Sequence, residues 1–419
     1  MPTPAHRSPN LPRISAIVIG WLTEPCHRPL APLVAGWDDT DWEAARWAVQ
    51  VHGIGPLLDR AAARWPDAAA LHPTLCSYLA EQRRLSGERV ALLLQDLAEI
   101  LRACEQEQIA AIPLKGSLLA TLYYTEPGLR PMNDLDLLVR PADEQRMLRL
   151  LARLRYQPLA RSQKHVLLAR PESHGPVVSF TGEHPDNPRS LDLHTRLAEY
   201  FWGIKYDLTE EAWADSVSGR LQGAEARVLG PAALMHHLAI HASSDALARR
   251  LRLLHLADIA LVANKIDQAD WDRIVAGAQR RGEQRLVYPV LMLTSRYYPA
   301  VPAAVLRALR SGVPQALLQQ LDSTSLDQLS FCNPAPTTPA EKLRWFRPGY
   351  EQARALRHML LPNPGELGHW YPNLARPALL PIAYLRYAGE ILGWGVRRAL
   401  GRSRLSPAAP PGGADVRPE

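Results

Sequence analysis

The stretch AAIPLKGSLLATLYYTEPGLRPMNDLDLLVR, residues 110–140, decides the fold of this 419-residue chain. Its first residues, 110–114, form a short apolar run that is typical of a strand. A helical pattern follows from the Lys-Gly-Ser sequence at 115–117, and Pro-Gly at 127–128 ends it. Polar and apolar residues then alternate over 134–139, which predicts a second strand. The stretch therefore predicts a strand, a helix and a second strand in close succession.

Two carboxylates share one face of the second predicted strand. Side chains two positions apart point to the same side of a strand, so Asp134 and Asp136 project together. Neighbouring carboxylates repel each other, and a divalent cation such as Mg²⁺ relieves the repulsion while also binding substrate phosphates. Gly116 and Ser117 lie where the first strand turns into the helix, and backbone N–H groups at such a turn favour a phosphate. The stretch thus predicts a metal-binding pair beside a phosphate-binding turn.

The order of strand, Gly-Ser, helix and Asp-x-Asp resembles the polymerase-β type of nucleotidyltransferase superfamily. The wider pattern L-K-G-S, L-Y, G-L-R-P and N-D-L-D-L-L-V is more narrowly similar to the bacterial uncharacterised nucleotidyltransferase family. The resemblance extends upstream to W-E-A-A-R-W, which begins at Trp42, and downstream to L-R-L-L-H-L-A-D-I at 251–259.

This resemblance implies a third acidic residue on a later strand. Asp192 in S-L-D-L-H-T-R-L, residues 190–197, is the best match. The implied reaction is Mg²⁺-dependent transfer of a nucleoside monophosphate from an NTP to an acceptor hydroxyl, with release of pyrophosphate. In such two-metal chemistry Asp134 and Asp136 hold the ion on the triphosphate. All three acids hold the second ion, and Asp192 is the expected base.

Three basic residues near these acids are predicted to bind the nucleotide together with the Gly-Ser turn, and each has an alternative role. Lys115 either neutralises triphosphate charge or forms a cap or an ion pair. Arg130, four residues before Asp134, either contacts phosphate or pairs with the acids. His194 shares a strand face with Asp192, and it either touches phosphate, orients a carboxylate or is a structural histidine.

Downstream of the predicted strands, two helical segments contain polar residues of types that can bind a metal ion or take part in catalysis. His237 and His241 have the i, i+4 spacing of zinc ligands, but the H-E-x-x-H pattern is missing, so packing or base stacking is the favoured role. Asp258 is predicted to cap a helix or to pair between domains rather than to act as a catalyst.

The distribution of patterns predicts an α+β protein. A small mixed β-sheet forms the nucleotidyltransferase core, flanked by helices, with a helical N-terminal lead-in and a C-terminal helical domain. The expected strands cover 110–114, 134–139, 166–168, 177–180 and 191–194. The expected regions are a disordered arm (1–14), N-terminal helices (15–108), the core (109–208), a helical domain (209–311), a linker (312–340), a C-terminal helical segment (341–404) and a disordered tail (405–419).

The amino-acid composition says more about the cellular location of the protein than about its reaction. The net charge of +6 comes mostly from dispersed arginines, which indicates a solvated surface and only weakly favours polyanions. Four cysteines without C-x-x-C spacing favour a reducing cytoplasm, and no segment is expected to span a membrane. The expected partners are an NTP and an acceptor that is a small molecule, a protein or RNA. Two rival functions remain, a silent nucleotide-binding or interaction module and a toxin-like transferase that modifies RNA.

Overall fold

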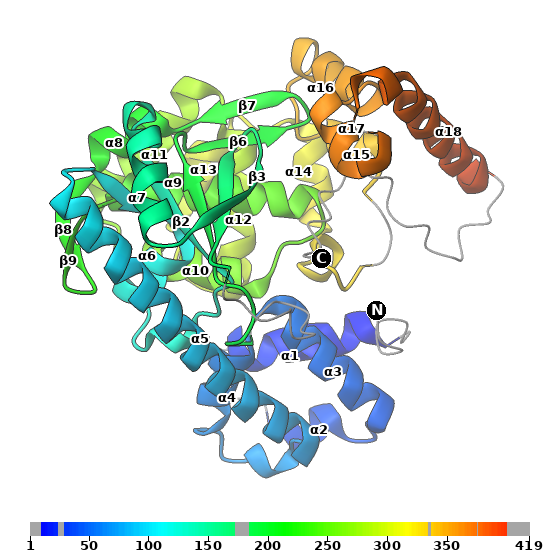
Figure 1. Ribbon diagram of the computed structural model, residues 1–419. Coiled ribbons are helices and arrows are strands. Elements are labelled where there is room, and N and C mark those ends of the chain that lie inside the picture. Colours follow the sequence, from blue (N-terminus) through cyan, green and yellow to red (C-terminus); the bar gives the residue numbers. More distant parts are fainter. Residues whose placement is uncertain (1–9, 24–28, 172–183, 334–336, 375, 400–419) are drawn as a thin grey trace.

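A five-stranded sheet lies at the centre of the molecule, with helices around it (Figure 1). The computed structural model describes residues 10–23, 29–171, 184–333, 337–374 and 376–399. The expected strand at 177–180 and the terminal segments 1–9 and 405–419 lie outside these residues. The small mixed sheet with helical regions before and after it confirms the predicted α+β class.

The central sheet has the strand order β1-β2-β5-β4-β3. The β2–β5 pair is parallel, whereas β1–β2, β5–β4 and β4–β3 are antiparallel. Four of these strands lie where the sequence patterns place them, and β3 was not anticipated. Their bounds are β1 (Ala111–Pro113), β2 (Asp134–Val139), β3 (Gln157–Arg161), β4 (His165–Ala169) and β5 (Ser190–His194).

The apolar positions of β2 explain why this strand is central. Leu135, Leu137, Leu138 and Val139 are almost fully buried, so hydrophobic side chains anchor both faces of the strand. Helix α6 (Lys115–Leu122) connects β1 toward β2, and α7 (Glu144–Arg153) follows β2. Two small hairpins extend the region beyond β5: β6 (Ala198–Phe201) with β7 (Ile204–Asp207), and β8 (Val217–Leu221) with β9 (Ala224–Val228).

The N-terminal region is helical, as the sequence predicts. Asp38 caps α3, because its carboxylate accepts the backbone N–H of Asp41 at 2.9 Å. The long helix α5 carries buried Leu93, Leu97 and Ile100 at helical spacing and leads directly into β1. Part of the expected disordered arm is ordered, since α1 begins at Leu11. The helices are α1 (Leu11–Thr23), α2 (Leu30–Val34), α3 (Asp39–His52), α4 (Gly55–Ala62) and α5 (Pro73–Gln106).

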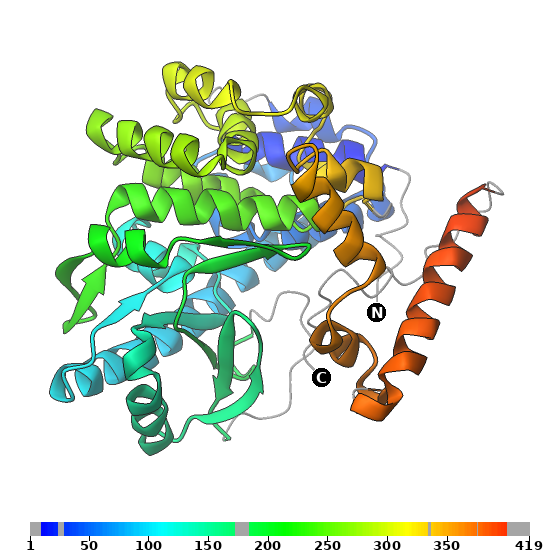
Figure 2. The same ribbon diagram turned by 90° about the horizontal axis from the view of Figure 1, so that it is seen from above.

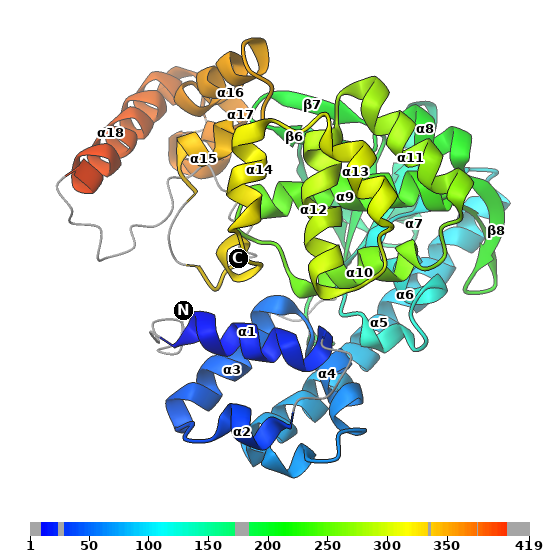
Figure 3. The ribbon, with the colours of Figure 1, turned by 180° about the vertical axis from the view of Figure 1, so that it is seen from behind.

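A second group of helices packs against the sheet region from behind (Figure 3). One continuous hydrophobic core runs from the N-terminal helices through the sheet into this group. The expected linker 312–340 contains α14, whose Leu317 and Leu321 are buried in that core, so this part of the segment packs as a helix. The helices are α8 (Thr209–Asp215), α9 (Pro231–Leu247), α10 (Leu253–Ala263), α11 (Gln268–Arg281), α12 (Gln284–Tyr297), α13 (Ala303–Arg310) and α14 (Gln315–Asp322).

The region of α15 and α16 still packs on the main core, where Phe346 and Ala355 are buried, whereas Figure 2 shows α18 standing apart from the rest of the molecule. Leu367, Tyr371, Ala383 and Tyr387 form a small hydrophobic cluster of their own between α17 and α18. Within the described segments, no helix is both long and apolar enough to cross a membrane. The helices are α15 (Pro339–Leu343), α16 (Tyr350–Leu360), α17 (Pro364–Trp370) and α18 (Leu380–Ala399).

Candidate functional site

The parallel pairing of β2 with β5 brings the three predicted acids together. Asp136 lies directly opposite Asp192 in the strand register, and Asp134 lies opposite Ser190. Asp134 and Asp136 are two residues apart and therefore share the face of the sheet on which Asp192 also projects. Asp192, more than fifty positions after Asp134 and Asp136, thus joins them in a group of three carboxylates on one face of the sheet.

The pKa values of the three acids differ because their neighbours differ. Burial raises the pKa of Asp134, and the nearby Asp136 raises it further. Burial followed by the charges of Asp136 and Asp134 raises the pKa of Asp192 to about 8. Burial also acts to raise the pKa of Asp136, but Lys115 and His194 outweigh it and hold that pKa well below its ordinary value. The group therefore has more carboxylates than cations to balance them.

Lys115 and His194 both contact the central acid. The Lys115 ammonium donates to Oδ1 of Asp136 at 2.9 Å, and Nε2 of His194 lies 3.0 Å from the same oxygen. Lys115 has a backbone φ of 42°, a left-handed conformation that L residues rarely adopt and that is often found at functional sites. The strained turn at the start of α6 aims the ammonium at the acids. Of the roles open to these residues, the structure shows ion pairing for Lys115 and carboxylate contact for His194.

The Gly-Ser turn lies beside this pair. Gly116 is buried, and a Cβ atom there would be 2.7 Å from Nη1 of Arg130 and 3.0 Å from Sδ of Met132. The hydroxyl of Ser117 donates to the carbonyl oxygen of Leu114 at 3.2 Å. Close packing against Arg130 is therefore one physical reason for glycine at this position, in addition to the expected approach of a phosphate.

Arg130 pairs with a distant acid and not with the predicted metal ligands. Its Nη2 donates to Oδ2 of Asp258 at 2.9 Å and its Nε donates to Oδ1 at 3.2 Å. The Tyr124 hydroxyl donates to the same carboxylate at 2.8 Å. The pair joins the segment before β2 to α10, which agrees with the interdomain role expected for Asp258. Since its guanidinium is already engaged twice, Arg130 has a structural role in this arrangement.

Arg89 on α5 is a positioning residue for which the sequence carries no local signal. Its buried guanidinium donates to the carbonyl oxygens of Met132 at 3.0 Å, Asn187 at 2.9 Å and Pro188 at 3.0 Å. These carbonyls belong to the two turns that enter β2 and β5. One side chain therefore holds both turns, and with them the starts of the two strands that carry the acids.

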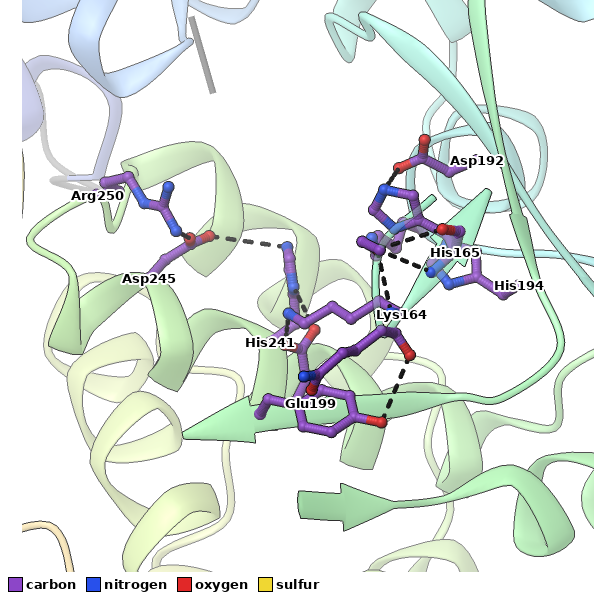
Figure 4. A network of polar contacts seen from close by, with 12 residues as sticks. Lys164, His165, Asp192, His194, Glu199, His241, Asp245 and Arg250 are labelled. Carbon is purple, nitrogen blue, oxygen red and sulfur yellow. Dashed lines mark hydrogen bonds and ion pairs between the residues drawn. The ribbon is translucent and has the colours of Figure 1, made fainter. Parts of the chain in front are cut away.

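A second polar network continues from the acids toward the helices, and Figure 4 shows its members. Nε2 of His165 on β4 lies 3.5 Å from Oδ2 of Asp192. The next residue back, Lys164, pairs with buried Glu199 on β6, and Nδ1 of His241 lies 3.0 Å from Oε1 of that glutamate. His241 also lies 3.7 Å from Asp245 through Nε2. His241 is thus part of a polar network that joins Glu199 to Asp245.

The residues at this site fit a divalent cation. Asp134 and Asp192 are carboxylates in a partly buried group with too few cations, and carboxylate oxygens are the ligands that hard divalent ions prefer. One ligand atom from each of His165, Asp192 and His194 lies within 4.8 Å of the others, which is compatible with a shared ion. Asp136 remains available as a bridging ligand through the oxygen that Lys115 does not contact.

Comparison with solved structures gives distant likenesses. The antibiotic-resistance factor ANT(2'')-Ia, solved in solution, has a TM-score of 0.32 and 13% identity, covering 46% of this chain and 94% of its own. An antigenic nucleotidyltransferase-like protein from Paracoccidioides brasiliensis has a TM-score of 0.26 and 13% identity, covering 54% of this chain and 97% of its own. Such low TM-scores carry no weight for function. None of the curated proteins compared with the chain matches it.

A family model supplies the stronger comparison. The model described as uncharacterised nucleotidyltransferase matches residues 38–299, which run from α3 to the end of α12 and include the whole central sheet. This match covers more than half of the chain and confirms the resemblance inferred from the Gly-Ser and Asp-x-Asp patterns. It indicates nucleotidyl transfer as the general activity. The chain therefore belongs to the uncharacterised nucleotidyltransferase family.

Proposed function

We propose that this protein transfers a nucleoside monophosphate from an Mg²⁺-bound NTP to an acceptor hydroxyl and releases pyrophosphate. A bond forms between the acceptor oxygen and the α-phosphorus, and the α–β phosphoanhydride bond breaks. The single observation that carries the proposal is the parallel β2–β5 register, which sets Asp136 opposite Asp192 with Asp134 on the same face. The acceptor is a small molecule, a protein or RNA, and a cytoplasmic location is part of the proposal.

Each residue has a separate role in this reaction. Asp134 and Asp136 hold the cation on the triphosphate, while Asp192 completes a second cation position and accepts the proton of the acceptor hydroxyl. Divalent cations held there would neutralise triphosphate charge and acidify that hydroxyl. The Lys115 ammonium adds positive charge 2.9 Å from Asp136, and the backbone of Gly116 and Ser117 faces the phosphates.

Positioning and charge neutralisation supply most of the catalysis in this scheme. Burial and the charges of Asp136 and Asp134 raise the pKa of Asp192 in the cation-free protein. A divalent cation bound beside Asp192 would favour its ionised form, the form that can take up the proton of the acceptor hydroxyl. Arg89 and Arg130 act at a distance from the substrate by holding the turns that precede β2 and β5 and by joining β2 to α10.

The test compares Asp192→Asn with wild-type protein. The substitution is nearly isosteric and removes the base and one bridging charge, losses that fall on the transition state more than on the bound nucleotide. We expect turnover to fall at least about a hundredfold, the lower range for losing a general base. Affinity for Mg²⁺-NTP should change by no more than a few fold. Labelled NTPs and cell extract, followed by pyrophosphate release, provide the assay.

The outcomes distinguish the proposal from its rivals. Asp134→Ala and Asp136→Ala should abolish Mg²⁺-NTP binding, and unchanged affinity in both would refute the assignment of the nucleotide-side cation. Wild-type protein that binds Mg²⁺-NTP but never releases pyrophosphate with any extract would support a silent module instead. Labelled RNA as the product would identify the RNA-modifying alternative. Normal turnover by Asp192→Asn would show that Asp192 is not the base.

A further inference from the structure

Two histidines lie on the acceptor side of the carboxylate group, next to Asp192. His194 is two residues after Asp192 on β5, so both side chains project from the same face of the strand. His165 begins β4 and pairs with His194 across the antiparallel β4–β5 ladder. The two imidazole rings meet edge to face, with centroids 5.2 Å apart. The pairing of β4 with β5 therefore places two nitrogen ligands beside one carboxylate.

The distances among these side chains are close to those between ligands of a single ion. With metal–ligand bonds of about 2.1 Å, adjacent ligands lie about 3.0 to 3.4 Å apart and opposite ligands about 4.2 Å apart. Nε2 of His165 is 3.5 Å from Oδ2 of Asp192. One ligand atom from each of His165, Asp192 and His194 lies within 4.8 Å of the others.

One ring nitrogen of His165 on β4 has no hydrogen-bond partner among the described residues. Nδ1 of His165 is buried and makes no hydrogen bond within the part of the chain that the structure describes. A buried polar nitrogen without a partner costs free energy, and an ion coordinated by that nitrogen would offset the cost.

A second cluster with similar ligands lacks such a nitrogen. His52, Asp327 and Cys332 also have ligand atoms within 4.8 Å of one another. However, Nε2 of His52 lies 3.0 Å from the hydroxyl of Ser15, and that hydroxyl donates to Asp327. The backbone N–H of Leu253 donates to Nδ1 of His52 at 3.4 Å. Both nitrogens of this imidazole already have hydrogen-bond partners, so the cluster joins core elements of the fold.

We propose that His165 and His194, with Asp192, form the acceptor-side cation site, and that this site prefers a transition-metal ion such as Mn²⁺ over Mg²⁺. The inference rests on the proposed function, because it concerns the second cation of the same reaction. Imidazole nitrogen is a poor ligand for Mg²⁺, which prefers oxygen, and a good one for divalent transition metals. The nucleotide-side position between Asp134 and Asp136 has only oxygen ligands and still suits Mg²⁺.

The decisive test detects nitrogen ligation directly. Untagged full-length protein is loaded with Mn²⁺ without nucleotide, and electron spin-echo envelope modulation records coupling to ¹⁴N. We expect ¹⁴N modulation in wild-type protein and its loss in the double variant His165→Asn/His194→Asn. Titration calorimetry should show Mn²⁺ affinity falling at least about tenfold in that variant, since even outer ligands of metal sites contribute this much. The preference for Mn²⁺ over Mg²⁺ should shrink with it.

A matched control excludes effects of histidine replacement itself. His72→Asn replaces a histidine that caps α5 with another good capping residue, far from the acids, and should keep the ¹⁴N signal. Wild-type protein that binds Mn²⁺ without ¹⁴N modulation would overturn the inference, as would a signal that persists in the double variant. If that variant does not fold, the wild-type spectrum still decides. Failure of Mg²⁺-NTP binding in wild-type protein would instead overturn the proposed function.

Discussion

Two sets of acidic residues lie in and near the candidate site. They differ in how many cationic or imidazole partners surround them. The clustered acids, Asp134, Asp136 and Asp192, share one face of the sheet and have a single lysine among them. The paired acids, Glu199, Asp245 and Asp258, lie on β6, α9 and α10 and contact cationic or imidazole groups. These partners are Lys164 and His241 for Glu199, His241, Arg250 and His255 for Asp245, and Arg130 for Asp258.

The pKa values of Glu199 and Asp245 differ from that of Asp192 in this way, whereas Asp136 resembles the paired acids because Lys115 and His194 lower its pKa. Burial would raise the pKa of Glu199, but His241 and Lys164 lower it well below its ordinary value. Burial likewise opposes the lowering of the pKa of Asp245 by His241 and His255. On the sheet, by contrast, burial and neighbouring carboxylates raise the pKa of Asp192 to about 8. Residues of one type at similar burial thus stabilise the fold in one region and disfavour their own ionisation in the other.

This comparison predicts that removing a paired acid has the largest effect on stability. Asp258→Ala leaves the buried guanidinium of Arg130 without its carboxylate, and breaking a buried pair costs about 3 to 5 kcal/mol. Urea denaturation measures the free energy of unfolding. Glu126→Ala is the control, because that glutamate pairs with Arg83 at the surface and such pairs contribute at most about 1 kcal/mol. Equal effects of the two substitutions would contradict the comparison.

Removing a clustered acid should instead stabilise the metal-free protein in a pH-dependent way. The pKa of Asp192 is higher in the folded state than in the unfolded state, so ionisation favours unfolding. In EDTA, wild-type and Asp192→Asn proteins should have equal pH dependence below about pH 4. Between about pH 4 and 8 the wild type should lose stability relative to the variant, on the order of a few kcal/mol, with no further change above.

The same denaturation experiment, repeated at several pH values, measures this difference. A wild-type protein that gains stability relative to Asp192→Asn as the pH rises would show that Asp192 has a cationic partner of its own. In that case it would belong with the paired acids.

A divalent cation should stabilise the protein through the clustered acids, with a somewhat smaller effect. An ion that binds only the folded state at a hundred times its Kd adds about 2.7 kcal/mol. Mg²⁺, the ion suited to the Asp134 and Asp136 position, should therefore raise the Tm of wild-type protein when it is added after EDTA treatment, as followed by calorimetry. The double variant Asp134→Asn/Asp136→Asn should show little increase, whereas Glu126→Ala should respond like wild type. An equal increase in the double variant would place the bound ion elsewhere.

Local sequence pattern determined much of this architecture. Alternation over 134–139 placed Asp134 and Asp136 on one face of a strand, because the side-chain period of a strand does not depend on the rest of the fold. The apolar spacing of the long helix and the Asp38 cap were equally local features. These patterns also carried the family resemblance, which the match over 38–299 confirms, and the α+β class.

Only the tertiary structure decided which charges meet. Arg130 contacts Asp258 across 128 positions, and Arg89 reaches the turns before both acid-bearing strands. His165 became a neighbour of Asp192 only through the β4–β5 pairing, although its own strand was expected to begin one residue later. Such contacts depend on how distant elements pack and on which buried groups compete for each partner. No periodicity in the chain encodes that outcome, so the sequence by itself determined where the acids lie, and the packing decided which of them are left without a cation.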